Sequence, residues 1–304
     1  MIQMINLKLT AILIFLSLFC LKSPAMGMDK NKIIIQIGFS DKLFLDIKDN
    51  DAKASTKVMT ELMIAKKGVD AGCETYIFHD LQSIKTALKE KRLDAISLPA
   101  VEYLELVQEV PLDPVSAAVI GGKVTEKYVL LAHRDNNAQN LKWLKNKEII
   151  FGAKWMGSLS KIWIDDLLIK DGLSPIDQLC SKTKYVSRVS QAVLPVFFKQ
   201  ADACIVTQRG LKTMVELNPQ IGRELEALAT SSDFLNGIMC FRKDYNEKEY
   251  RSEFRQTLFE LHLDPKGKQF LNFFKMDRLV PFEPSFLKST QELVEDYQKI
   301  SKKR

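Results

Sequence analysis

The sequence predicts two Rossmann-like α/β lobes joined by a two-strand hinge, and three observations lead to this fold class. Short β-rich runs alternate with helical periodicities, which is typical of βαβ units. The same order of three strand-helix units occurs twice along the chain. The length of 304 residues also exceeds what one hydrophobic core usually serves, which favours two lobes over one.

The elements of the two sets follow from hydrophobic periodicity. Strands of the first set are predicted over 32–40, 74–80 and 93–100, and its helices over 53–68, 81–92 and 101–109. Strands of the second set are predicted over 148–152, 183–187 and 202–208, and its helices over 160–173, 191–200 and 209–217. Because a helix separates consecutive strands, we expect mainly parallel sheets. Three further helices are predicted over 247–263, 267–276 and 288–303.

The two sets share a local pattern of helix, polar turn, Asp-Ala and buried strand. It occurs around Asp94-Ala95 in the first set and around Asp202-Ala203 in the second. A short polar side chain at this point can satisfy free backbone groups before the strand begins. The repetition therefore indicates two lobes of similar architecture.

Two extended apolar segments, 114–134 and 228–244, connect the sets and are predicted to cross between the lobes. We therefore assign 28–124 and 236–304 to lobe 1 and 125–235 to lobe 2. Two crossings make a hinge, and lobes joined by a hinge can close on a ligand.

The N-terminus predicts export to the periplasm. Lys8 precedes an apolar run over 9–21, and small residues follow at Ala25 and Gly27, so residues 1–25 are predicted to be a cleaved signal peptide. The run is shorter than the roughly 20 residues of a membrane span. An uncleaved anchor remains the alternative. Phe19 stands where a lipoprotein anchor at Cys20 would need a small residue.

The charge pattern argues against a nucleic-acid partner. Removal of the signal peptide takes away Lys8 and Lys22 and no acid, so the net charge falls from +6 to +4. The cations alternate with acids apart from the terminal 302–304 cluster, whereas nucleic-acid binding needs a cationic face. Four cysteines remain (Cys73, Cys180, Cys204 and Cys240), and both a disulfide and buried free thiols are compatible with their spacing.

No pattern for catalysis, a metal or a cofactor is found. The sequence lacks GxSxG, GxGxxG, P-loop and HExxH motifs, so we expect no cofactor and no enzyme activity. His79, His133 and His262 are interpreted as surface or structural histidines. The paired Asp165-Asp166 is interpreted as acids early in a helix, where they complement the helix dipole.

The loops at the carboxyl ends of the strands are the candidate ligand site, because open α/β sheets bind ligands there. Gly157, Ser158 and Ser160 start a helix after strand 148–152, and their hydroxyls and free N–H groups suit an oxyanion. The alternative is an ordinary helix cap worth about 1 kcal/mol. The other candidate contacts are Phe39, Ser40, Tyr103, Ser190, Thr207 and Gln208. Tyr103 is equally compatible with a core contact beside Leu104 and Val107.

Four segments carry a resemblance to a known family: FGAKWMGSLSKIW, LKEKRLDAISLPAVEY, FFKQADACIVTQ and LDPKGKQFLNFFKMDRLVPFEP. They resemble the periplasmic phosphate/phosphonate-binding components of ABC transporters, which have the type II periplasmic binding protein fold. The family's helix start is a denser Ser-Thr-Ser-Gly run, and here Leu159 stands at the middle position. The resemblance implies a solute-binding protein that closes on a small anionic ligand, works with an inner-membrane ABC permease and is a monomer. A sensor subunit for a membrane kinase, and an enzyme on the same fold, remain alternatives.

Overall fold

The computed structural model describes residues 33–43, 48–66, 71–152, 157–245 and 248–301. The predicted signal peptide, Cys20 and the terminal 302–304 cluster therefore lie outside the described residues. Within the described part, no helix combines the length and the apolar character that crossing a membrane requires.

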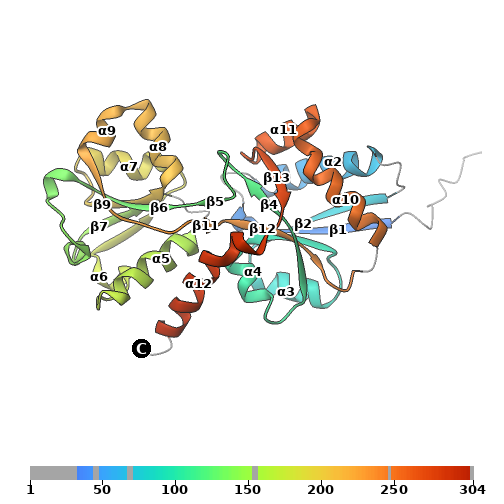
Figure 1. Cartoon of the computed structure of the whole chain (residues 1–304), viewed down its shortest axis with the longest axis horizontal. Coiled ribbons are helices and arrows are strands. Elements are labelled where there is room, and N and C mark those ends of the chain that lie inside the picture. The colour runs from blue at the N-terminus through green and yellow to red at the C-terminus, as the bar shows by residue number, and fades with distance from the viewer. Residues whose placement is uncertain (1–32, 44–47, 67–70, 153–156, 246–247, 302–304) are drawn as a thin grey trace, which may run out of the picture. The chain divides into compact units, whose positions relative to one another are not determined.

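The first sheet has six strands in the order β13-β4-β12-β3-β1-β2. Helices α3 and α4 cover one of its faces, and α2, α10 and α11 cover the other (Figure 1). The strands are β1 (Ile33–Ser40), β2 (Ala71–Phe78), β3 (Ala95–Pro99), β4 (Leu112–Val119), β12 (Gly237–Arg242) and β13 (Arg278–Pro281). The helices are α2 (Asp49–Lys66), α3 (Leu81–Lys89), α4 (Ala100–Leu106), α10 (Lys248–Glu260) and α11 (Pro265–Phe273).

The second sheet has five strands in the order β10-β6-β9-β7-β8. One apolar core lies between this sheet and α5 and α6, and another lies under α7, α8 and α9 (Figure 1). The strands are β6 (Tyr128–His133), β7 (Glu148–Phe151), β8 (Lys182–Tyr185), β9 (Ala203–Thr207) and β10 (Leu225–Thr230). The helices are α5 (Gly157–Lys170), α6 (Ile176–Leu179), α7 (Val189–Phe197), α8 (Gln208–Leu217) and α9 (Pro219–Glu224).

Two short strands join the lobes, as the fold class predicts. The chain leaves the first sheet after β4 and passes through β5 (Thr125–Glu126) into β6. It returns from β10 through β11 (Phe234–Leu235) into β12. β5 and β11 pair antiparallel with each other in a sheet of their own.

The expectation of mainly parallel sheets is wrong. β1 pairs parallel with β3, and β7 pairs parallel with β8 and β9. In contrast, β12 is antiparallel to both β3 and β4, and β6 is antiparallel to both β9 and β10. The cause is the hinge. When the chain crosses into a lobe, it joins that lobe's sheet as a strand that runs opposite to the strands of the βαβ units. β6 enters the second sheet in this way, and β12 enters the first.

The predicted Asp-Ala turns are confirmed in both sets. The Asp94 carboxylate accepts a hydrogen bond from the backbone N–H of Gln36 at 2.8 Å, and the Asp202 carboxylate accepts one from Glu148 at 2.9 Å. Three residues before each aspartate, a lysine has a positive φ of 58°: Lys91 and Lys199. The two turns therefore share a backbone conformation as well as a sequence pattern, because each ends a helix through a left-handed residue.

Helix α12 (Pro284–Ser301) contributes to the cores of both sheets. Leu287 belongs to the apolar cluster of the first sheet, and Leu293 to the cluster between the second sheet and α5. Between them, the Thr290 hydroxyl accepts a hydrogen bond from the backbone N–H of Leu235 in β11 at 2.9 Å. One helix thus buries its two halves against different cores.

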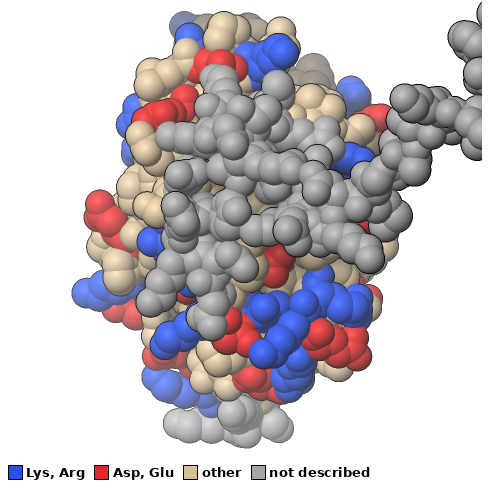
Figure 2. Space-filling view, turned by 90° about the vertical axis from the view of Figure 1, so that its right-hand side faces the viewer, with Lys and Arg blue, Asp and Glu red and all other residues tan. Residues whose placement is uncertain are grey.

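Charged residues of both signs share the surface. Figure 2 shows one face on which Lys and Arg lie among Asp and Glu. Ion pairs of the first lobe include Lys85 with Glu109 at 2.5 Å and Lys91 with Asp244 at 2.9 Å. This mixing corresponds to the alternation of cations and acids in the sequence.

Candidate ligand-binding site

The carboxyl ends of β1 and β3 meet at one edge of the first sheet. The two strands are parallel, and Phe39 lies opposite Ser97 in their register. Ser40 ends β1 and is buried, and Lys42 in the following 3₁₀ turn reaches Glu102 of α4, with 2.5 Å between Nζ and Oε1. Glu102 is itself buried, and its Oε2 has no hydrogen-bond partner among the described residues. This edge therefore holds the hydroxyl of Ser40, which was predicted as a ligand contact, and the ion pair of Lys42 with Glu102, which was not predicted.

A second polar cluster at the same edge surrounds His79, which follows β2. Its Nδ1 lies 2.8 Å from Asp41, and its Nε2 lies 3.0 Å from Asp49. The hydrogen bond to Asp41 and the charges of both carboxylates raise the pKa of His79. His79 is thus an exposed, paired histidine, in agreement with its interpretation as a surface residue.

In the second lobe, α5 begins at Gly157, after β7, and Ser158 is its second residue. Leu159 and Trp163 are buried in the apolar core between α5 and the sheet. Trp163 stacks on Tyr128 of β6, with 6.3 Å between ring centroids. Ser160 is also buried. Because Leu159 belongs to this core, it anchors the first turn of the helix. A hydroxyl in its place would also face the core, so the presence of leucine takes no hydrogen-bond donor away from a ligand.

The interpretation of Asp165-Asp166 as acids early in a helix is wrong. The first turn of α5 contains no acid, and both aspartates lie in its second half. Asp165 is fully buried and accepts a hydrogen bond from the backbone N–H of Ile176 at 2.7 Å. Its other oxygen is 2.6 Å from Lys161 Nζ. The aspartate thus connects α5 to the start of α6, a role that depends on a contact ten residues or so away in the chain and that local sequence does not reveal.

The remaining second-lobe candidates follow β8 and β9. Ser190 is half-buried in the first turn of α7. Thr207 is buried and caps α8, because its hydroxyl accepts a hydrogen bond from the backbone N–H of Gly210 at 3.0 Å. Gln208 is exposed, and its backbone N–H donates to the carbonyl of Lys127 at 2.8 Å. The Thr207 hydroxyl therefore has a structural partner already.

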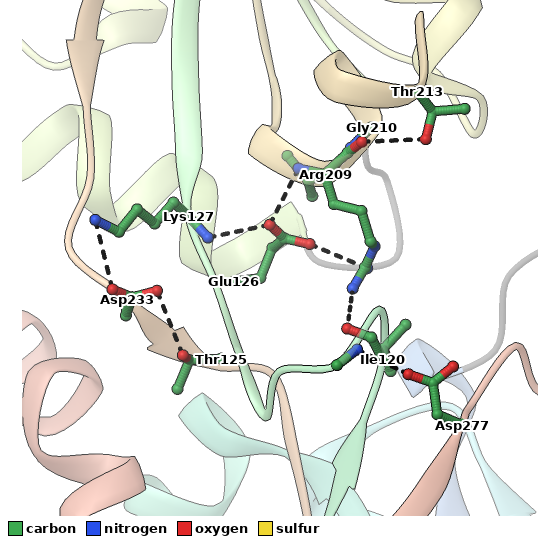
Figure 3. A network of polar contacts seen from close by, with 11 residues as sticks. Ile120, Thr125, Glu126, Lys127, Arg209, Gly210, Thr213, Asp233 and Asp277 are labelled. Carbon is green, nitrogen blue, oxygen red and sulfur yellow. Dashed lines mark hydrogen bonds and ion pairs between the residues drawn. The ribbon is translucent and has the colours of Figure 1, made fainter. Parts of the chain in front are cut away.

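The start of α8 is occupied by a carboxylate of the protein itself (Figure 3). Glu126 of β5 accepts hydrogen bonds from the backbone N–H groups of Arg209 and Lys127, at 3.3 and 3.2 Å. The guanidinium of Arg209 lies 3.0 Å from the other Glu126 oxygen and donates to the carbonyl of Ile120 at 2.8 Å. Since a negative charge at a helix start is stabilising, Glu126 fills the place that a bound anion would take at α8.

The two aromatic candidates of the first lobe differ in their surroundings. Tyr103 is buried in the cluster between the sheet and α4, where desolvation raises the pKa of its phenol. Phe39 is half-buried and lines a pocket of about 290 Å³ on the opposite face of the sheet. Tyr103 therefore makes the core contact that was one of its two predicted roles. Phe39, in contrast, has open space beside it.

No disulfide joins the four described cysteines, which decides between the two alternatives for them. Burial raises the pKa of Cys180 to about 12 and raises the pKa values of Cys204 and Cys240 further. These thiols stay protonated at neutral pH and are poor nucleophiles. Among the described residues, no group of three or more His, Cys, Asp or Glu side chains has the arrangement of a metal site.

The other two histidines differ in their surroundings. His133 is buried, and its Nδ1 accepts a hydrogen bond from the backbone N–H of Asp135 at 3.2 Å. His262 lies in the 3₁₀ turn after α10, and its Nδ1 has no partner in the described part of the chain.

The family model of the periplasmic substrate-binding proteins of phosphonate ABC transporters matches residues 48–286. This chain belongs to that family. The match covers more than half of the chain and includes both lobes. As a member of the family, the protein is the periplasmic substrate-binding component of an ABC transporter. No curated protein matches the sequence at a significant level.

Solved structures of similar fold include three that match almost end to end. XAC2383 from Xanthomonas citri, bound to ATP, is 15% identical with a TM-score of 0.65, over 88% of this chain and 98% of that one. A binding protein component of an ABC phosphonate transporter from Pseudomonas aeruginosa is 15% identical with a TM-score of 0.60, over 89% and 88%. PhnD1 from Prochlorococcus marinus, in complex with methylphosphonate, is 14% identical with a TM-score of 0.60, over 88% and 98%. These likenesses show the type II periplasmic binding protein fold.

Of the nine predicted contacts, the structure brings Phe39 and Ser40 to the carboxyl edge of the first sheet, and Gly157, Ser158 and Ser160 to the first turn of α5. Glu102 and Arg209 follow the carboxyl ends of β3 and β9, where the sequence predicts the ligand site, but neither was among the predicted contacts. Lys42 and the pairing of Glu126 with Arg209 were not predicted. No local signal marks that pairing, because Arg209 lies about 80 residues from Glu126 in the chain.

Proposed function

We propose that the protein binds a small organic oxyanion, of the phosphonate, phosphate or sulfonate class, at the start of α5. The observation that carries the proposal is the burial of Leu159 and Trp163, which anchors the start of that helix in the core. The first turn of a helix has free N–H groups, and the hydroxyls of Ser158 and Ser160 would add hydrogen-bond donors beside them. Both the helix dipole and the hydrogen bonds favour a negative ligand there.

The remaining predicted contacts complete this site. Phe39 and Ser40 would close over the ligand from the first lobe, with Tyr103 behind them. Ser190, Thr207 and Gln208 would border it from the second lobe. The lobes that close would be 28–124 with 236–304, and 125–235, as the sequence predicts. PhnD1, a family relative by fold, is known in complex with methylphosphonate, which supports the choice of ligand class.

The same proposal covers the setting of the protein. We infer that residues 1–25 direct export and are removed, and that the mature protein acts as a monomer in the periplasm. It would deliver its ligand to an ABC permease in the inner membrane and perform no catalysis. The protonated state of the buried thiols supports a binding role over a nucleophilic one.

A thermal-shift screen tests the proposal with inorganic phosphate, methylphosphonate, methanesulfonate and acetate. A ligand present at 100 times its dissociation constant stabilises the folded state by about 2.7 kcal/mol. For a protein of this size, that raises the melting temperature by roughly 5 to 10 °C. If none of the four anions shifts the melting temperature, the oxyanion site is refuted.

Substitution at the helix start then locates the site. Ser158→Ala combined with Ser160→Ala should weaken binding of the active anion by about 10- to 100-fold, because two donors are lost. Ser252→Ala is the matched control, since Ser252 is exposed on α10 of the first lobe. Equal affinity of the double variant and the control would leave the helix start with a capping role only.

A further inference from the structure

The first lobe contains a pocket of about 290 Å³ between its sheet and α2, α10 and α11. This volume is at the lower end of the range for small-molecule sites. The pocket arises from small residues on one face of the sheet. In the register of the strands, Ser97 lies opposite Met239, and Met239 lies opposite Ser116. Ala118 follows two residues after Ser116 and therefore points to the same side.

The face of this sheet toward α3 and α4 carries Ile96, Leu98 and Ile238 in a close-packed core. The face toward α10 and α11 carries the small residues Ser97, Ser116, Ala118 and Gly237 beside larger ones such as Phe39 and Met239, and the covering helices leave a pocket over them. Large apolar side chains from these helices and the turn after α10 wall it, including Met59, Phe254, Leu258 and Phe270.

Two polar side chains in the wall, Ser116 and Asn236, each have a buried oxygen that lacks a hydrogen-bond partner among the described residues. The Ser116 side chain is 1% exposed, and its hydroxyl has no hydrogen-bond partner among the described residues. A buried hydroxyl left unpaired in an apolar environment destabilises the folded protein. An occupant with a polar atom, or a water carried with it, would satisfy this group.

The pocket wall includes residues that follow strands of both lobes. Phe39, a predicted ligand contact at the carboxyl end of β1, lines it. Arg209, which follows β9 of the second sheet, lines it as well. β9 pairs parallel with β7, the strand that precedes α5, so a ligand held at the start of α5 would extend along this edge toward the pocket.

We propose that this pocket holds the hydrocarbon substituent of the ligand, so that the protein selects organic oxyanions with an apolar chain or ring over methylphosphonate and inorganic phosphate. The inference rests on the proposed function for the anionic group and adds a substrate class. A mostly apolar wall with a few polar side chains, such as Ser97, Ser116 and Asn236, suits an alkyl or aryl group. An anion without a substituent would bury no apolar surface there.

A chain-length series measured by isothermal titration calorimetry tests the proposal on the unaltered mature protein. The probes are methyl-, butyl-, hexyl- and phenylphosphonate, with inorganic phosphate. Affinity should rise about fourfold per added methylene until the pocket is full, because each buried CH₂ contributes about 0.8 kcal/mol. If methylphosphonate binds and the longer chains bind equally or worse, the substituent pocket is refuted and the oxyanion site stands. If no probe binds, the proposed function fails as well.

Two variants that fill the pocket locate the substituent. Ala118→Leu and Ser97→Leu each add bulk inside it, and should lower hexylphosphonate affinity at least tenfold while leaving methylphosphonate affinity within about twofold. Ala227→Leu is the matched control, because Ala227 is an exposed strand residue of the second sheet. Circular dichroism checks that the variants fold. Hexylphosphonate binding that is unchanged in a folded variant would overturn the proposal, and the chain-length series decides if neither variant folds.

Discussion

At the scale of single residues, Leu159 shows how burial changes the meaning of a motif. In the sequence it interrupts a run of hydroxyls that would otherwise face an anion. In the structure it is 4% exposed and packs in the core between α5 and the second sheet. A hydroxyl at this position would be buried among apolar side chains, where leaving it unpaired is costly. Leu159 therefore anchors the helix start at which Ser158 and Ser160 are proposed to bind the anion.

Asp165 is a residue-scale case whose function is stability. Asp165→Asn keeps an acceptor for the Ile176 N–H but removes the charge that pairs with Lys161, which retains Asp177 at 3.1 Å. We expect a loss of about 1 to 3 kcal/mol in the free energy of unfolding, because one side of the pair is fully buried. Urea denaturation measures it. Asp171→Asn, at an exposed position after the same helix, should change stability by less than about 0.5 kcal/mol. Equal effects at both positions would contradict the structural role of the pair.

At the scale of elements, the two α-to-β turns are the clearest link between pattern and structure. In both lobes a helix ends, a lysine adopts a left-handed conformation, and the carboxylate of the following aspartate accepts a hydrogen bond from the first strand of the same set, β1 or β7. The pattern was visible in the sequence because the conformation of the turn is local. Each aspartate also exchanges hydrogen bonds with a strand more than 50 residues away, Asp94 with Gln36 and Asp202 with Glu148, and these bonds tie the turn to the sheet.

Removing these aspartates tests whether the turns are equivalent. Asp94→Ala and Asp202→Ala each leave a buried strand N–H without its acceptor, so each should cost about 1 to 3 kcal/mol of unfolding free energy. Because the sites lie in separate lobes, the double variant should show the sum of the two losses within about 0.5 kcal/mol. Chemical denaturation of the three variants gives the values. A strongly non-additive result would mean that the turns are coupled through contacts the structure does not contain.

At the scale of the whole molecule, the hinge strands and α12 determine how the lobes are connected. β5 pairs with β11, Glu126 binds Arg209, and α12 places Leu287 in one core and Leu293 in the other. A C-terminal helix was predicted from its periodicity and assigned to lobe 1. Its contacts with α5 depend on residues more than 100 positions away in the chain, which periodicity does not encode.

Because α12 packs in the cores of both lobes, we expect the two lobes to unfold together in one cooperative transition. All three tryptophans (Trp143, Trp155 and Trp163) lie within 125–235, so their fluorescence reports lobe 2, whereas far-ultraviolet circular dichroism reports both lobes. Leu293→Ala should lower stability by about 2 to 4 kcal/mol, with both probes giving the same midpoint. Leu217→Ala, at a position 78% exposed, is the matched control and should have little effect. A variant whose circular dichroism midpoint falls while its fluorescence midpoint stays would show that the helix supports one lobe alone.

The sequence by itself determined the α/β class, the two matching sets of units and their turns, because local periodicity and short polar motifs encode them. It also placed Gly157, Ser158 and Ser160 at a helix start. Only the tertiary structure decided the antiparallel crossing strands, the core role of Leu159, the Glu126 carboxylate at α8 and the pocket beside Phe39. Each of these depends on which distant segments pack together, and packing is settled by the whole chain burying its apolar surface at once.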